Sequence, residues 1–186
     1  PSIFNSEGIL KEIKLVIWTT TPWTIPANQA ISVNQKLDYV IAQSPDKSFI
    51  VTANDLLEKV SNSVGINFER IASIKGSLLD GVIYKHPLFD RNSPVVLGGD
   101  YITTESGTGL VHTAPGHGVD DFNTGKKYNL PISCPVDAKG FLTKEAGKFE
   151  GLNVLKDANK FIIDDLTHTS SLLIEIPYEH RYPYDW

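Results

Sequence analysis

The chain has 186 residues, of which 41% are hydrophobic and 21% charged, a composition that is typical of a folded globular protein and excludes a disordered one. Its formal net charge of -5 has the wrong sign for a protein that holds nucleic acid mainly through contacts with phosphates. A single cysteine, Cys134, excludes an internal disulfide, and no apolar run is long enough to span a bilayer, so we expect a cytoplasmic location and no membrane partner.

Short β-branched stretches bounded by turn residues predict strands along the first part of the chain. They run over residues 12–20, 29–33, 38–43 and 48–52. A helix is predicted next, at residues 54–64, because apolar side chains recur there on one stripe, namely Leu56, Leu57, Val60 and Val64. Thr52 or Asn54 can cap its start, and Gly65 can end it.

The remainder of the chain begins with further predicted strands, at residues 68–75, 81–85, 95–104 and 109–113. A helix at about residues 119–128 carries Asp120 and Asp121 in its first turn and Lys126 and Lys127 in its last, which suits the helix dipole at both ends. A third helix, over residues 154–167, is expected to bury its apolar side chains, namely Leu155, Ala158, Phe161, Ile162 and Leu166. A last strand is predicted over residues 171–176.

Many short strands with a few helices predict a β-rich mixed α/β fold, in which short helices pack around a β-barrel-like or twisted-sheet body. No repeat, low-complexity tract or charge block divides the sequence, so we expect one domain over residues 1–186. The sequence contains no methionine and starts at Pro1, from which we expect a piece of a larger protein.

The segment from Trp18 to Asn28 gathers hydroxyl, amide and indole side chains at a predicted strand end. Its polar members are Thr19, Thr20, Thr21, Thr24 and Asn28. Pro22 and Pro26 prevent a simple continuation of strand or helix, so the chain bends and presents donors into a shared space. Such a bend suits a neutral polar ligand or a carbonyl that becomes an oxyanion. The structural alternative is a threonine-rich strand end followed by a proline-fixed turn.

A second polar segment runs over residues 105–122. Its glycines at 107 and 109 precede a strand rather than a helix, and no Gly-Lys-Ser/Thr follows, which excludes a phosphate-binding P-loop. His112 lies near the end of a predicted strand and Asp120 and Asp121 start the next helix, so an imidazole and a carboxylate can face one pocket. The alternative is a core histidine beside an aspartate that complements the helix terminus.

Metal and covalent chemistry are poorly supported by the sequence. His112, His117 and Asp121 are possible metal ligands, but their spacing fits no helix-borne or knuckle pattern. No Gly-x-Ser-x-Gly elbow is present, and Cys134 has no histidine nearby in the sequence that would activate it. We therefore expect no metal, no cofactor and no covalent intermediate.

With both segments in view, the sequence resembles the inserted editing (CP1) domain of isoleucyl-tRNA synthetase, a class I aminoacyl-tRNA synthetase. The matching motifs lie at residues 18–24, 26–28, 107–121 and 180–186. The valyl and leucyl relatives typically carry arginine, an acidic residue, and lysine or methionine where this chain has Thr21, Trp23 and His112. One departure is Leu110, where the family often has alanine.

The resemblance implies hydrolysis of the ester in valine-charged tRNA(Ile) by a positioned water, with valyl-adenylate as a further substrate. Asp121 would hold the α-ammonium group of the substrate, and the helix N-terminus would keep this carboxylate deprotonated. Thr19, Thr20 and Thr21 would contact the terminal adenosine and the ester. The residues implied to be catalytic are Thr20, His112 and Asp121.

Other positions of the resemblance carry supporting roles. Trp23 and Thr24 would shape the wall of the pocket, Asn28 would support the loop, and His112 would line the amino-acid side chain and the ribose. His117 is given no direct role. The partners implied are the aminoacylated 3′ end of tRNA(Ile) and the rest of the parent synthetase.

The sequence lacks the His-x-Gly-His and Lys-Met-Ser-Lys-Ser signatures of class I synthetases, so no aminoacylation is expected of this chain alone. Two other functions remain open. One is a non-catalytic module that binds the tRNA 3′ end or an amino acid, and the other is a metal-dependent hydrolase.

Overall fold

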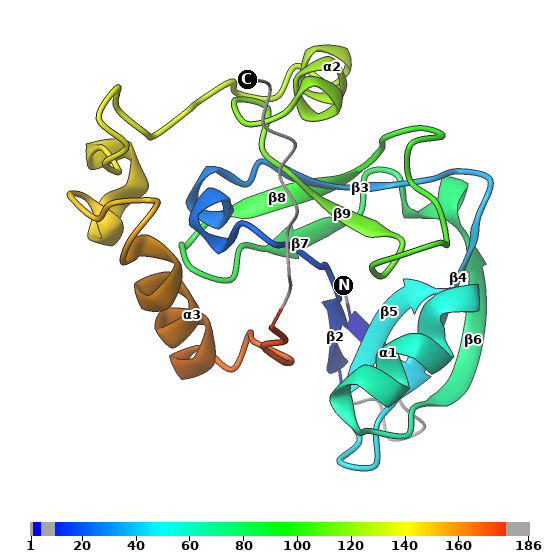
Figure 1. Cartoon of the computed structure of the whole chain (residues 1–186). Coiled ribbons are helices and arrows are strands. Elements are labelled where there is room, and N and C mark those ends of the chain that lie inside the picture. Colours follow the sequence, from blue (N-terminus) through cyan, green and yellow to red (C-terminus); the bar gives the residue numbers. More distant parts are fainter. Residues whose placement is uncertain (1, 5–9, 178–186) are drawn as a thin grey trace, which may run out of the picture.

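The computed structural model describes residues 2–4 and 10–177 (Figure 1). Two sheets form within this part of the chain, with strand orders β1-β2-β5-β4-β6 and β7-β8-β3-β9. Each sheet keeps two edge strands among the described residues, so neither closes into a barrel. The predicted β-rich mixed α/β fold with a few short helices is confirmed. The motif at residues 180–186 lies outside the described residues.

The five-stranded sheet is built around β5 (Phe49–Ala53), which pairs in parallel with β2 (Leu10–Leu15) and antiparallel with β4 (Asp38–Gln43). Its edges are β1 (Ser2–Phe4) and β6 (Glu69–Lys75). Every residue of β5 is buried, because α1 (Leu57–Val64) covers one face of the sheet and the second sheet covers the other. Figure 1 shows α1 lying across this sheet.

The four-stranded sheet is centred on β3 (Ala30–Val33), whose residues are all buried. This strand pairs in parallel with β8 (Asn92–Leu97) and antiparallel with β9 (Leu110–Thr113), and β7 (Ile83–Lys85) forms the far edge. Side chains of both sheets form the main hydrophobic core, to which Val33, Val51 and Val95 contribute. Because strands alternate their side chains between the two faces, this core occupies only one face of each sheet.

A separate core lies beside the sheets, where α3 (Ala158–His168) packs against two 3-10 helices, η1 (Pro22–Ala27) and η4 (Lys144–Phe149). Figure 1 shows α3 on the opposite side of the molecule from α1, while α2 (Val119–Lys127) lies near β3 and β8. The two shortest 3-10 helices are η2 (Asn54–Leu56) and η3 (Gly76–Leu79). No helix among the described residues has the length and apolar character needed to cross a membrane.

The first predicted helix consists of η2 followed by α1, and Gly65 ends it in the left-handed conformation at φ 68°. The predicted caps are wrong, because neither helix has a side-chain cap. The hydroxyl of Thr52 instead donates to the carbonyl oxygen of Thr108 at 2.8 Å, and the side-chain amide of Asn54 donates to Asp55. The charged residues of α2 lie as predicted, with Asp120 and Asp121 in the first turn.

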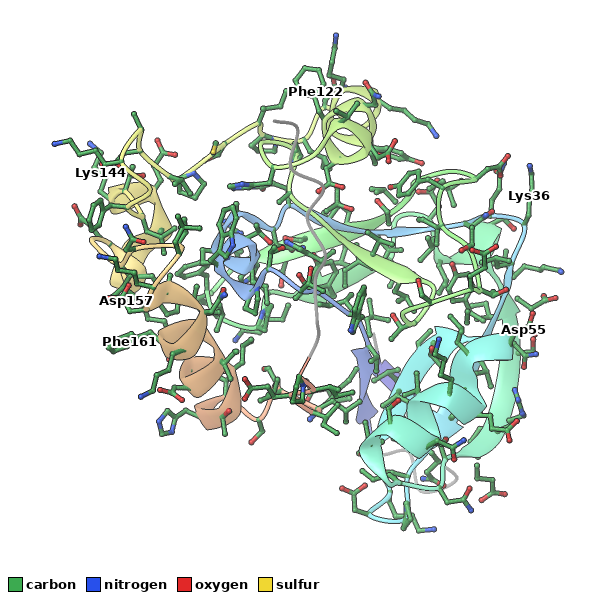
Figure 2. All side chains as sticks on the ribbon, in the orientation of Figure 1. Lys36, Asp55, Phe122, Lys144, Asp157 and Phe161 are labelled. Carbon is green, nitrogen blue, oxygen red and sulfur yellow. The ribbon has the colours of Figure 1, made fainter. Side chains whose placement is uncertain are left out.

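The third helix begins at Ala158, later than predicted, and fewer of its apolar side chains are buried than expected. Ala158, Ile162 and Leu166 recur every four residues and are buried as expected. Leu155 and Phe161 were expected in the core but are 88% and 53% exposed. Leu155 precedes the helix, and Phe161 lies on its outer face, where Figure 2 shows it pointing away from the sheets.

Three strand predictions also need correction. The strand predicted over residues 12–20 ends at Leu15, and the one predicted over residues 95–104 runs over Asn92–Leu97 instead. Residues 171–176 form no strand, because they follow α3 along a mostly exposed path without a sheet partner. Strand propensity alone does not create such a partner.

Candidate functional site

One cavity of about 360 Å³ is lined by both polar segments singled out from the sequence. The bend contributes Trp18, Thr19, Thr20, Thr21 and Thr24. The segment around β9 and α2 contributes Gly107, Thr108, Gly109, Leu110, Val111, His112, Ala114, His117 and Asp121. The connecting loop adds Tyr101, Ile102, Thr103 and Ser106.

Strand pairing explains why segments about 90 residues apart meet here. The 3-10 helix η1 leads through Asn28 directly into β3, and β3 pairs antiparallel with β9 so that Ile31 lies opposite His112. The bend therefore lies beside the end of β9. Pro22 starts η1 in the first turn, where its missing N–H costs nothing, and Thr24 becomes buried.

A close approach of the loop before β9 to the end of β5 fixes one wall of the cavity. Ala53 donates its backbone N–H to the carbonyl oxygen of Thr108 at 2.8 Å. Gly109 has φ +78°, and a Cβ there would lie 2.4 Å from the Cβ of Ala53. Only glycine satisfies both the backbone conformation and the contact distance.

The three consecutive threonines of the bend, Thr19, Thr20 and Thr21, differ in their hydrogen bonds. The hydroxyl of Thr19 accepts from the backbone N–H of Thr21 at 3.0 Å and lies 3.3 Å from the hydroxyl of Thr21. Thr20 lines the cavity and is half-buried. These hydroxyls give the cavity both donors and acceptors beside the histidine and the carboxylate.

His112 is held by protein groups at both ring nitrogens. The side-chain amide of Asn28 lies 2.7 Å from its Nδ1, and the hydroxyl of Thr24 lies 3.0 Å from its Nε2. The nitrogen of this amide carries two N–H donors and cannot accept. One N–H donates to the carbonyl oxygen of Ala30 at 2.8 Å, so the other donates to Nδ1 of His112. His112 then donates through Nε2 to Thr24, which donates to the carbonyl oxygen of Thr21 at 2.8 Å.

Burial lowers the pKa of His112 from its ordinary 6.5 to about 4, with His86 and His117 adding to the effect. This histidine is therefore neutral at neutral pH, as the hydrogen-bond pattern requires. Since both ring nitrogens already have partners, His112 orients the bend and is not a free proton acceptor.

Two residues that sequence reasoning missed hold Asn28 in place. The hydroxyl of Tyr84 donates to the side-chain oxygen of Asn28, and the guanidinium of Arg91 donates to the backbone oxygens of Asn28 and Pro26. Burial raises the pKa of Tyr84, so its hydroxyl stays protonated and donates. No sequence signal could have found either residue, because Tyr84 has the pattern of an ordinary strand residue and Arg91 that of a turn residue.

Asp121 lies at the cavity, whereas Asp120 is exposed and does not line it. One oxygen of Asp121 accepts from the backbone N–H of Ala114 at 3.0 Å. Burial nevertheless raises the pKa of this carboxyl, and Asp120 adds to the rise, while the Ala114 hydrogen bond opposes it. Burial therefore outweighs the Ala114 hydrogen bond in setting the direction of this pKa shift. That the carboxylate is deprotonated at neutral pH stays a prediction.

The rings of His117 and Trp23 contact each other at one wall of the site. The rings of Trp23 and His117 meet edge to face, with centroids 5.2 Å apart. Trp23 does not line the cavity; it lies behind His117, and its backbone N–H donates to the side chain of Asn159 on α3 at 3.0 Å. His117 does line the cavity, although sequence reasoning assigned it no direct role. Asn28 lies behind His112 in the same way.

Metal ligation was weighed from the sequence for His112, His117 and Asp121. Among residues 2–4 and 10–177, no group of three histidine, cysteine, aspartate or glutamate side chains is placed to hold a metal ion. Both ring nitrogens of His112 have protein partners, which leaves this residue without a coordinating lone pair.

Comparisons with known proteins place this site in a family. Residues 4–170 match the family model described as "Leucyl-tRNA synthetase, editing domain". The chain is 81% identical over 186 residues to isoleucine–tRNA ligase of Prochlorococcus marinus (strain NATL1A), and 57% identical over 182 residues to that of Parasynechococcus marenigrum. These matches cover 100% and 98% of this chain but only 19% of either ligase.

Solved structures share the fold at low sequence identity. A crystal structure of GlLeuRS-CP1 matches with a TM-score of 0.70 at 17% identity, covering 92% of this chain and 85% of the other. The editing domain of P. falciparum cytosolic leucyl-tRNA synthetase matches with a TM-score of 0.65 at 15% identity, covering 84% and 78%. The chain belongs to the leucyl-tRNA synthetase editing-domain family of aminoacyl-tRNA synthetases.

Proposed function

We propose that this chain is the domain of an isoleucine–tRNA ligase that hydrolyses the ester linking valine to the 3′ end of tRNA(Ile). The observation that carries the proposal is the cavity of about 360 Å³ that Asp121 and the threonine-rich bend both line. A carboxylate beside several hydroxyls suits an aminoacyl ester, which carries one cation and several neutral oxygens. The 81% identity to an isoleucine–tRNA ligase supports the amino-acid class.

In this proposal each residue contacts a different part of the substrate. Asp121 pairs with the α-ammonium group of valine, and the hydroxyls of Thr19, Thr20 and Thr21 bind the terminal adenosine and the ester oxygens. Thr20 and Asp121 touch the reacting part of the substrate. His112 lines the cavity as a neutral ring and fixes Thr24, while Trp23 and Asn28 support the wall from behind.

The attacking group is a water held by these polar groups and by the free ribose hydroxyl of the substrate. An aminoacyl ester is already activated by its ribose, so preorganised hydrogen bonds suffice for hydrolysis. Neither a metal nor a covalent intermediate enters this mechanism. Valyl-adenylate presents the same ammonium group and adenosine, and it is a second substrate of the proposal.

Energetics explain why a second site is needed. For isoleucyl-tRNA synthetases, which are the established example, a hydrophobic pocket prefers isoleucine to valine by only about 150-fold. A smaller hydrolytic pocket accepts valine and rejects isoleucine, because overpacking by one methylene costs roughly 1–3 kcal/mol. The two sites therefore select by size in opposite directions.

The charge of the chain fits a site that receives only the end of a tRNA. With a net charge of -5, this domain is not the main holder of the phosphate backbone, so the rest of the synthetase binds most of the tRNA. We propose that the 186 residues of this chain act in the cytoplasm as one unit within a longer ligase.

The test uses the full-length ligase that contains this chain and measures release of valine from valine-charged tRNA(Ile). Asp121→Ala is expected to abolish deacylation, because the ammonium group loses its partner. Asp120→Ala is the matched control, since its side chain is exposed and lies outside the cavity, and it is expected to retain activity.

The same assay separates the alternatives. A wild-type enzyme that binds valine-charged tRNA without releasing valine is a binding module, and this result would refute the proposal. Loss of deacylation after exhaustive chelation would identify a metal-dependent hydrolase instead.

A further inference from the structure

A series of hydrogen bonds joins the edge strand β7 to the threonine-rich bend. It starts at the hydroxyl of Tyr84, which donates to the side-chain oxygen of Asn28. The amide nitrogen of Asn28 lies 2.7 Å from Nδ1 of His112, and Nε2 of His112 lies 3.0 Å from the hydroxyl of Thr24. That hydroxyl donates to the carbonyl oxygen of Thr21 at 2.8 Å. Residues from three parts of the sequence therefore form one hydrogen-bond series.

Two backbone carbonyls fix the direction of this hydrogen-bond series, because a carbonyl can only accept. At its centre, the amide nitrogen of Asn28 also donates to the carbonyl oxygen of Ala30 at 2.8 Å. The oxygen of this amide therefore faces Tyr84, and its second N–H faces His112. At the end of the series, the carbonyl oxygen of Thr21 accepts from the last hydroxyl. His112 satisfies both of its neighbours only with its proton on Nε2 and its lone pair on Nδ1.

Tyr84 begins the series from outside the cavity. It is the middle residue of β7, only 8% of it is exposed, and it does not line the cavity. Asn28 is 4% exposed, so bulk water does not replace a donor that its side-chain oxygen loses. Hydrogen bonds in a series polarise one another, so removal of the first donor weakens the bonds that follow. The hydroxyl of Tyr84 therefore strengthens the contact between Asn28 and His112.

The series ends in the part of the bend to which the proposed function assigns the substrate. The carbonyl oxygen of Thr21 accepts from the hydroxyl of Thr24 and from its backbone N–H, the latter at 2.9 Å. The backbone N–H of Thr21 in turn donates to the hydroxyl of Thr19 at 3.0 Å. The positions of these hydroxyls in the cavity therefore depend on contacts that begin at Tyr84.

Two other histidines near the site lie outside this series. Nε2 of His86 lies 3.1 Å from the carbonyl oxygen of Ile25, and its Nδ1 accepts from the backbone N–H of Leu88. Nε2 of His117 is buried and has no hydrogen-bond partner among the described residues. Of these three histidines, His112 is the one that links a buried support to the bend.

We propose that Tyr84 is a positioning residue for hydrolysis of the aminoacyl ester: its hydroxyl, acting through Asn28, holds His112 in the Nε2–H tautomer that fixes the threonine-rich bend. This inference rests on the proposed function, because the bend is the part of the site that binds the ester. Tyr84 acts without touching the substrate, since it does not line the cavity.

The first measurement compares full-length ligases by kcat/KM for release of valine from valine-charged tRNA(Ile). Tyr84→Phe removes only the hydroxyl, and we expect kcat/KM to fall roughly tenfold, the loss of about one hydrogen bond. Replacement of Tyr84 by para-aminophenylalanine, whose amino group can donate to Asn28, is expected to recover most of this loss.

Tyr128→Phe is the matched control for the kinetic measurement. It removes a tyrosine hydroxyl that accepts from the backbone N–H of Leu97 at 3.0 Å, outside both the cavity and the series. Its kcat/KM is expected to stay within about twofold of wild type, because the support of the bend is unchanged.

The second measurement is NMR of the imidazole nitrogens of His112 at neutral pH, in the 186-residue chain with labelled histidine. The signals of His112 are identified by their absence from His112→Gln. The wild type should show a protonated Nε2 and an unprotonated Nδ1. In Tyr84→Phe the Nδ1 signal should move toward that of a nitrogen without a hydrogen bond, whereas Tyr128→Phe should leave it unchanged. A general loss of stability would not produce this difference.

Four results would overturn the inference. In the kinetics they are a Tyr84→Phe variant within about twofold of wild type, an aminophenylalanine variant as impaired as Tyr84→Phe, and an equal loss in Tyr128→Phe. In the NMR spectra it is a wild-type His112 that carries its proton on Nδ1. If Tyr84→Phe does not fold, para-fluorophenylalanine, which fills the space of the hydroxyl without donating, replaces it and is expected to show the same loss.

Failure of the proposed function is recognised separately. If the wild-type ligase releases no valine, the positioning of the bend is tested by equilibrium binding of a non-hydrolysable valyl-adenosine mimic. Binding that is roughly tenfold weaker in Tyr84→Phe would still support the inference. Unchanged binding would refute it.

Discussion

Acid is expected to destabilise this chain through its two buried neutral histidines. Burial lowers the pKa of His112 and of His86 from 6.5 to about 4. Between these pH values each of the two histidines is protonated in the unfolded chain but neutral in the folded chain. The free energy of unfolding therefore falls as the pH drops from 6.5 to about 4. A pKa gap of this size corresponds to about 3 kcal/mol for each histidine, and below the folded pKa the loss is complete.

The assay is urea unfolding of the 186-residue chain at a series of pH values from neutrality down to about pH 4. The free energy of unfolding of the wild type should fall by several kcal/mol, whereas His112→Gln, which cannot titrate, should lose about 3 kcal/mol less over the same range. Burial raises the pKa of Asp121, which acts in the opposite direction, but this contribution is common to both proteins.

His168→Gln is the matched control, because His168 is exposed, and its pH dependence should follow the wild type. Parallel pH profiles for wild type and His112→Gln would refute the reasoning. Such a result would mean that His112 has the same pKa in the folded and the unfolded chain, so that Nδ1 gains a proton even though it faces the side-chain amide of Asn28.

Three further predictions concern the walls and supports of the cavity. Gly109→Ala should destabilise the chain by at least about 1–3 kcal/mol in urea unfolding, because the new methyl group meets Ala53 in an unfavourable backbone conformation, and an unchanged midpoint would contradict this. Tyr84→Phe should cost about 1–3 kcal/mol without leaving a cavity, since the buried side-chain oxygen of Asn28 loses its donor, and thermal unfolding of the single variant measures it. Ile162→Ala should cost about 2–5 kcal/mol, whereas Phe161→Ser on the exposed face of the same helix should change stability by less than about 0.5 kcal/mol; equal effects would contradict the observed face of α3.

The elements that could be predicted from the sequence are those whose local pattern and tertiary environment agree. The strand at Asp38–Gln43 was predicted with its observed bounds, because a polar turn lies at each end of its apolar residues. The strand predicted over residues 171–176 failed because propensity says nothing about whether a partner strand exists. Phe161 is exposed because the buried stripe of α3 consists of Ala158, Ile162 and Leu166, which recur every four residues, and Phe161 lies outside this stripe.

The site was predictable only in its sequence-local parts. The two motifs carry most of the cavity lining, and the register of β3 against β9 then brings His112 beside the bend. Tyr84 and Arg91 lie far from both motifs in the sequence and reach Asn28 only through the fold. The missing partner of His117 is likewise a property of three-dimensional packing. The titration of Asp121 depends on burial, which composition does not reveal.

The hydrogen bond from Trp23 to Asn159 joins the bend to a helix that comes near the end of the described chain. During synthesis the ribosome delivers the bend first and α3 more than a hundred residues later. A nascent chain therefore carries its threonine cluster on an unsupported turn until α3 has emerged and docked. The bend is therefore expected to reach its final position only late in translation of this segment. Truncation before α3 would remove no strand of either sheet, but the bend would lose its hydrogen bond to Asn159.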